Sequence, residues 1–160
     1  MKVIDEFLSP FDFVPIAAEM KDQSFPWYYN DYICDVDDGL YQFTHLYYDI
    51  RRESQENSTF FYRMRPLIEK LGASNIQRVK ANLNPRTVFH RNGGYYCDDF
   101  PCSTSAIYYI NTNNGWTQFE NGKKVKCVAN RMVIFDSKLK HAGFSCTDEK
   151  RKIVINFNYA

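Results

Sequence analysis

Apolar residues in the second half of the chain occur in short runs that turn residues separate. From Ile76 onward these runs are IQRVKANL, TSAIYYIN, WTQFE, VKCV, RMVIF and KIVINFNY. Short runs rich in β-branched and aromatic residues, spaced by Gly and Asn, are typical of a β-sandwich or barrel. The segments TNNG and ENGK contain Asn-Gly, which tolerates the positive φ values of tight hairpins, so both are predicted hairpin turns.

The first 75 residues have a mixed pattern. Ser9-Pro10 or Asp12 is suited to begin a short helix that runs through Ile16 to Met20, although Pro15 leaves its first residue open. Residues 24–50, with FPWYYNDYI and LYQFTHLYYDI around DVDDG, are typical of short aromatic strands joined by a polar, hairpin-like loop.

A second helix is predicted over residues 58–71, where apolar residues recur at helical spacing. Gly72 supplies its end, and Pro66 is predicted to kink or restart it.

Length and composition predict one domain over residues 1–160, because 160 residues with 44% hydrophobic content suffice for a single core. We expect residues 1–75 to form N-terminal helices and edge strands, and residues 76–160 to form the core that carries the site. The formal net charge of +1 argues against a nucleic-acid partner. No run approaches the roughly 20 apolar residues that span a bilayer, so no membrane partner is expected.

The cysteines indicate a reducing compartment. Their number is odd, they form no CxxC pair, and no secretory segment opens the chain, so cytoplasmic location is expected. They are Cys34, Cys97, Cys102, Cys127 and Cys146.

Two residues at the ends of the β-rich half are candidate metal ligands. Two histidines and one carboxylate on one face of an iron ion leave the other positions open for a keto acid and dioxygen. In a sequence, such a ligand set consists of a His-x-Asp pair and a second histidine farther along the chain. Asp99 lies in YYCDDFP and His141 in LKHAGFS, but Cys97 stands two residues before Asp99.

The stretch from Arg78 to Tyr159 resembles prolyl-4-hydroxylase-type members of the Fe(II)- and 2-oxoglutarate-dependent oxygenases, most closely the small phage-encoded ones. The resemblance rests on three segments, NTNNGWTQFENG, VANRMVIFDS and IVINFNY. It extends into the N-terminal half through FPWYYNDYI and FTH. The resemblance implies a mainly β (α+β) fold: a double-stranded β-helix, or cupin-like jelly roll, with N-terminal helices packed on the outer sheet.

The same resemblance implies roles for particular residues. Asp99 is the expected iron carboxylate, His141 the distal histidine, and Tyr109 a contact of the keto acid. The far carboxylate of 2-oxoglutarate is expected on a basic residue of the last strand, either Arg151 or Lys152. Strand alternation favours Lys152, which shares a polar face with Asn156 and Asn158.

For four residues the sequence leaves more than one role open. Cys97 is a ligand through its thiolate, or His90 reaches in from the preceding strand, or the site holds metal weakly and the protein is an inactive relative. Asn84 contacts the cofactor or only turns the chain before Pro85. His45 faces the substrate or is a hydrogen-bonded structural histidine.

The resemblance implies an Fe(II)/2-oxoglutarate dioxygenase that hydroxylates an unactivated carbon of a prolyl or other peptidyl side chain. Its expected cofactors are Fe(II) and 2-oxoglutarate, with O2 as co-reactant and ascorbate as an optional reductant. A phage-encoded protein of this kind would work in the cytoplasm of the host cell. The alternatives are a catalytically inactive jelly-roll binding module and a cupin-like metalloenzyme that uses no keto acid.

Overall fold

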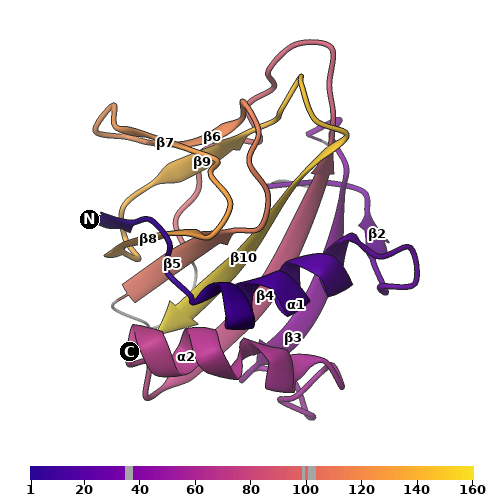
Figure 1. Cartoon of the computed structure of the whole chain (residues 1–160). Helices are drawn as coiled ribbons and strands as arrows, with labels where there is room; N and C mark the ends of the chain where they lie inside the picture. Colours follow the sequence, from indigo (N-terminus) through magenta and orange to yellow (C-terminus); the bar gives the residue numbers. More distant parts are fainter. Residues whose placement is uncertain (35–37, 99, 101–103) are drawn as a thin grey trace.

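Two antiparallel β-sheets face one another in the computed structural model, which describes residues 1–34, 38–98, 100 and 104–160 (Figure 1). The larger sheet has the order β1 (Lys2–Ile4), β8 (Arg131–Asp136), β5 (Thr104–Tyr109), β10 (Arg151–Tyr159), β4 (Ile76–Pro85), β3 (Gln42–Asp49) and β2 (Tyr28–Asn30). The smaller sheet has the order β7 (Lys124–Lys126), β6 (Trp116–Phe119) and β9 (His141–Phe144). The predicted mainly β, jelly-roll fold is therefore confirmed.

The predicted helices are also present. Helix α1 (Pro10–Lys21) begins after Ser9, whose Oγ accepts a hydrogen bond from the backbone N–H of Asp12 at 3.3 Å. Such a cap satisfies one of the free N–H groups at a helix start. The second helical segment consists of a 3-10 turn, η1 (Phe61–Met64), followed by α2 (Arg65–Leu71). Pro66 lies in the first turn of α2, so the helix restarts there, and Gly72 ends it with a φ of 65°.

Helices α1 and α2 lie across one face of the larger sheet, over β10, β4 and β3 (Figure 1). Their buried residues, among them Met20 and Leu67, pack with Val79, Ile153 and Phe157 of that sheet. These residues form a hydrophobic core between the helices and the larger sheet. The N-terminal helices therefore pack on the outer face of the larger sheet, as predicted. No helix of the described segments is long and apolar enough to cross a membrane.

Alternation along β10 assigns its two faces. Ile153, Ile155 and Phe157 belong to the core under the helices, whereas Val154 belongs to a second apolar cluster between the two sheets. Lys152 therefore faces the space between the sheets. This is the face that the sequence pattern predicts for it.

One of the two predicted hairpin turns is wrong. ENGK joins the paired strands β6 and β7, and Gly122 has the positive φ of 83° that the prediction requires. TNNG instead carries the chain from β5 in the larger sheet to β6 in the smaller one. Gly115 is needed there for space, because a Cβ at this position would lie 2.8 Å from the backbone oxygen of Phe144.

Candidate functional site

A cavity of about 600 Å³ lies between the two sheets. The inward faces of β4 and β10 form one wall, β9 and β6 contribute to the opposite wall, and segments before β3 and after β4 border the opening. The cavity thus occupies the interior of the jelly roll, where side chains from distant parts of the chain meet.

Lys152 is a buried cation at one end of this cavity, with only 3% of its surface exposed. Its Nζ donates hydrogen bonds to the backbone oxygens of Trp116 at 3.2 Å and Phe144 at 3.0 Å. Burial lowers the pKa of Lys152. An ammonium group has three donors, so one N–H remains for a ligand in the cavity.

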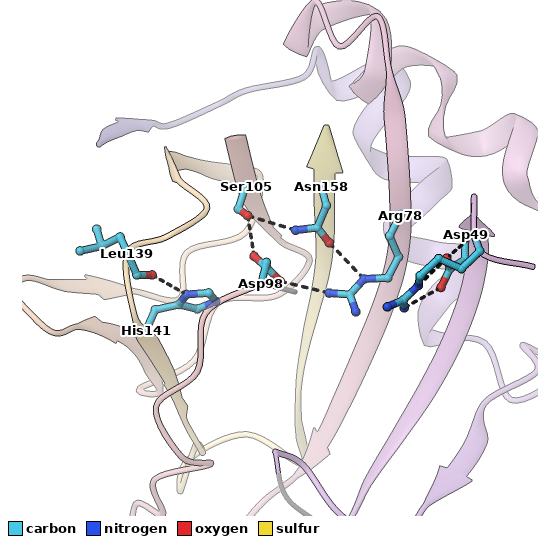
Figure 2. A network of polar contacts seen from close by, with 8 residues as sticks. Asp49, Arg78, Asp98, Ser105, Leu139, His141 and Asn158 are labelled. Carbon is cyan, nitrogen blue, oxygen red and sulfur yellow. Dashed lines mark hydrogen bonds and ion pairs between the residues drawn. The ribbon is translucent and has the colours of Figure 1, made fainter. Parts of the chain in front are cut away.

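His141 lies on the same wall as the oxygens that hold Lys152. Its Nδ1 is 3.1 Å from the carbonyl oxygen of Leu139, which can only accept, so Nδ1 carries the proton (Figure 2). In the neutral ring, Nε2 then has a free lone pair, and no described residue hydrogen-bonds to it. Burial lowers the pKa of His141 and favours this neutral form. A histidine held in this way is suited to bind a metal through Nε2.

The ammonium group of Lys152, which belongs to β10, lies over the same face of strand β9 as His141. A Cβ added to Gly143 would lie 3.4 Å from Nζ of Lys152, so the ammonium group stands directly over this glycine. Gly143 and His141 are two residues apart on β9, and alternate residues of a strand face the same side. The lysine and the imidazole therefore border the same part of the cavity.

Asp98 is the described carboxylate nearest to this end of the site, and its own charge raises the pKa of His141. One oxygen pairs with Nη2 of Arg78 at 3.1 Å, and the other accepts a hydrogen bond from Ser105 Oγ at 2.5 Å. Figure 2 shows Arg78 reaching from β4 to Asp98 and, through Nε, to Asn158 of β10 at 3.0 Å. Both oxygens of Asp98 are thus engaged by neighbouring side chains.

Tyr96 lies directly opposite His141. The two residues exchange backbone hydrogen bonds of 3.0 and 2.9 Å, and their rings are 4.5 Å apart. Residues directly opposite one another in an antiparallel pair face the same side, and alternation from Tyr96 favours that side for Asp98, which also lines the cavity. Cys97 is exposed at the edge of the cavity. Asp99, the predicted iron carboxylate, lies outside the described residues.

The described residues supply one well-prepared metal ligand, His141, and a carboxylate that Arg78 already occupies. Burial raises the pKa of Tyr96, so its phenol is protonated at neutral pH. No three His, Cys, Asp or Glu side chains among the described residues are grouped so that they could hold a metal ion. A metal site with three protein ligands therefore requires either the carboxylate of Asp99 or an Asp98 carboxylate that has left its ion pair with Arg78.

The residues predicted to contact the keto acid differ in whether they line the cavity. Asn84 lines the cavity on β4, directly opposite Lys152 on β10. Tyr109 is fully buried, and its hydroxyl donates to Thr117 Oγ1 at 2.7 Å, so Thr117 is the member of this pair that lines the cavity. Arg151 points to the other side of the sheet and donates to the backbone oxygen of Lys21 at 2.7 Å.

The two remaining histidines lie away from the cavity wall. His45 is buried between the oxygen of Pro26 at 2.9 Å and Ser58 Oγ at 2.7 Å, which is the structural alternative considered for it. His90 is exposed, packs on the ring of Trp116 and bonds through Nδ1 to the oxygen of Ser145 at 2.7 Å.

Sequence reasoning missed Arg78, Thr117 and the Tyr96–Asp98 pair. A signal for the pair was present, because YCD has the same spacing as CDD and only the pairing with β9 distinguishes them.

Comparison with solved structures identifies the architecture. A Pseudomonas putida prolyl-4-hydroxylase matches with a TM-score of 0.66 and 15% identity over 99% of this chain and 92% of its own. An oxidoreductase of the 2OG-Fe(II) oxygenase family from Burkholderia pseudomallei matches with a TM-score of 0.71 and 13% identity, covering 99% and 86%. The chain has the fold of the prolyl-4-hydroxylase-like oxygenases.

A prolyl hydroxylase from Trichoplax adhaerens, solved in complex with a peptide fragment of the hypoxia inducible factor oxygen degradation domain, also shares this oxygenase fold. Its TM-score is 0.61 and its identity 14%, with 99% of this chain and 82% of that chain covered. No family model and no curated protein matches the sequence. The resemblance read from the sequence is thus confirmed at the level of fold.

Proposed function

We propose that the protein is an Fe(II)/2-oxoglutarate-dependent oxygenase. One observation carries the proposal: Lys152 and His141 border the same part of one cavity, and each keeps one bonding position open. The open N–H of Lys152 is suited to a carboxylate of 2-oxoglutarate, as a charge-assisted hydrogen bond in a buried part of the cavity. The open Nε2 of His141 is suited to the metal.

The chain's own residues prepare the pocket. The carbonyl oxygens of Trp116 and Phe144 fix the ammonium group of Lys152, so little side-chain entropy is lost when a carboxylate binds. Leu139 fixes the proton of His141 on Nδ1 and keeps Nε2 unprotonated. Bound Fe(II) would supply activation of O2, coupled to decarboxylation of 2-oxoglutarate to succinate and hydroxylation of a substrate carbon.

Two sets of residues compete to complete the metal site with His141. The first is Cys97 with Asp99, as the sequence resemblance implies. The second is Tyr96 with Asp98, which strand pairing with His141 favours, and in this case Asp98 must leave Arg78. Both sets have lost the first histidine of the expected His-x-Asp pair.

Histidine substitution separates the two sets. If Tyr96 and Asp98 are the site residues, Tyr96→His raises Mn(II) affinity, measured by calorimetry, and Cys97→His leaves it unchanged. The opposite ranking would establish Cys97 and Asp99. Asp98→Asn and Asp99→Asn form a matched pair, because only the ligand carboxylate should be sensitive to loss of its charge.

Succinate release tests the proposed reaction. The protein is incubated with Fe(II), ascorbate, 2-oxoglutarate and O2, and we expect slow succinate formation even without a substrate. Circular dichroism and a cooperative thermal transition confirm that the sample is folded. Absence of succinate from the folded parent protein and from its Tyr96→His and Cys97→His variants would reject an oxygenase.

The second candidate is a jelly-roll binding module without catalysis. The engagement of both Asp98 oxygens, by Arg78 and Ser105, favours it, because this carboxylate is then unavailable to a metal. Calorimetry separates the candidates: an oxygenase binds 2-oxoglutarate more tightly with Mn(II) present, whereas the module is indifferent to the metal.

We propose a peptidyl substrate for the oxygenase. The support is fold similarity to proteins described as prolyl hydroxylases, one of them in complex with a peptide. Incubation with proline-containing peptides and mass spectrometry tests this, with a gain of one oxygen atom as the expected result.

A further inference from the structure

The cavity carries more positive charge than 2-oxoglutarate requires. Among its described lining residues, five are cationic and only Asp98 is acidic. The cations are Arg78, Lys80, Arg86, Arg91 and Lys152. Arg78 is paired with Asp98, and Lys152 is the proposed anchor of 2-oxoglutarate, so three cations remain unassigned.

Lys80 is the deepest of these three. It lies on β4 opposite Asn156, is partly buried, and has neither a hydrogen bond nor an ion pair with any described side chain. Burial, and after it the nearby charges of Arg78 and Arg51, lower its pKa to about 8, and Asp49 offsets only part of this effect. A partly desolvated ammonium group with two other cations nearby is a favourable partner for an anion.

Asn82 supplies a second unsatisfied group on the same wall. Its Oδ1 is buried and has no hydrogen-bond partner in the described part of the protein. Asn82 and Lys80 are two residues apart on β4 and both line the cavity. A ligand that fits this wall therefore offers an anion to Lys80 and an N–H to Asn82, as the backbone and side chain of an acidic peptide do.

The opening of the cavity exposes large apolar side chains. Val88 is 84% exposed, Phe89 79% and Tyr41 50%, and all three border the opening. Backbone hydrogen bonds from Arg86 to Lys150 and from the neighbouring Thr87 to Cys146 tie one end of this loop to the segment before β10. Apolar side chains held at an opening are typical of a surface that binds a partner.

We infer that the open part of the cavity binds a peptide segment with acidic side chains, and that this segment is the substrate. An acidic side chain would pair with Lys80, the peptide backbone would donate to Asn82, and apolar residues would pack on Val88 and Phe89. Arg86 and Arg91 would attract further acidic residues at the opening. This inference rests on the proposed function, because it places the peptide beside the Lys152 and His141 end of the cavity.

An acidic peptide fits better than two other anions. A small organic acid would neutralise Lys80 but leave Val88 and Phe89 exposed. A nucleic acid gains most of its affinity from many phosphate contacts spread over a basic surface, and the net charge of +1 provides no such surface.

Fluorescence polarisation tests the inference without turnover. The probes are a short fluorescein-labelled peptide of Glu, Ala and Leu, the same peptide with Gln in place of each Glu, and a labelled single-stranded oligonucleotide. We expect the Glu peptide to bind about tenfold more tightly than the Gln peptide, as one charge-assisted hydrogen bond warrants. Lys80→Gln should remove this preference, whereas the exposed Lys123→Gln should retain it.

Calorimetry of 2-oxoglutarate with Lys80→Gln is the companion measurement, because unchanged affinity shows that the anchor end of the cavity is intact. Equal binding of the Glu and Gln peptides would overturn the inference, as would an unaltered preference in Lys80→Gln. Tighter binding of the oligonucleotide that also depends on Lys80 would replace the acidic peptide with a nucleic acid. Succinate formation without peptide preference would leave the oxygenase proposal standing and remove only this inference.

Discussion

Replacement of Lys152 by methionine tests the proposed anchor of 2-oxoglutarate. The side chain keeps its length and apolar stem but loses the one N–H that is left after Trp116 and Phe144. A charge-assisted hydrogen bond contributes roughly 1.5–3 kcal/mol, so the Kd of 2-oxoglutarate should rise roughly 10- to 150-fold. The conservative Lys152→Arg keeps the charge in a planar fork and should have a smaller effect.

Stability must be measured alongside affinity. Lys152→Met leaves two backbone oxygens without these donors, at a cost of about 1–3 kcal/mol, but it also removes a charge from the interior, which offsets part of that cost. Calorimetric titration of 2-oxoglutarate in the presence of Mn(II), with thermal unfolding of the same samples, separates the effects. Lys123→Met, at an exposed turn, is the matched control. If folded Lys152→Met binds 2-oxoglutarate as tightly as the parent, the anchor is elsewhere.

Three further predictions concern packing, the inner wall and pH. Gly115→Ala places a Cβ 2.8 Å from the oxygen of Phe144, so the midpoint of thermal unfolding should fall by an amount that corresponds to roughly 1–3 kcal/mol, and an unchanged midpoint would contradict the tight approach. Tyr109→Phe removes the hydrogen bond to Thr117 and should cost about 1 kcal/mol in urea unfolding, with a mild loss of 2-oxoglutarate affinity. Affinity for the Glu peptide should fall from about pH 7 to about pH 9 as Lys80, with its pKa of about 8, loses its charge. Lys80→Arg should flatten this profile, and an equally steep profile in that variant would assign the titration to another group.

The strands and helices of this fold were largely predictable because local rules set them. Alternation identified the inward face of β10 and placed Lys152 in the cavity, since a strand that separates two cores must divide its residues between them. Ser9 and Gly72 marked helix ends through their own capping geometry. The prediction of a hairpin at TNNG was wrong because Asn-Gly indicates that the chain turns, but not that the strands before and after the turn pair with each other.

The arrangement of the site was less predictable because it depends on pairing between distant segments. Nothing in YYCDDFP distinguishes Tyr96-x-Asp98 from the triplet one residue later, and the choice follows from hydrogen bonds between Tyr96 and His141. Arg78 of β4 likewise reaches Asp98 across β10, where it contacts Asn158, and Asp98 is held from the far side by Ser105 of β5. Long-range strand register, which a single sequence does not specify, therefore decides which side chains share the cavity.

An experimental structure of the protein with Mn(II) and 2-oxoglutarate, determined without oxygen, tests most directly whether Lys152 and His141 form one binding site. We expect one carboxylate of 2-oxoglutarate on Nζ of Lys152 and Mn(II) on Nε2 of His141, in the cavity between the two sheets. Either ligand bound outside this cavity, or His141 left without metal while 2-oxoglutarate is present, would contradict this expectation.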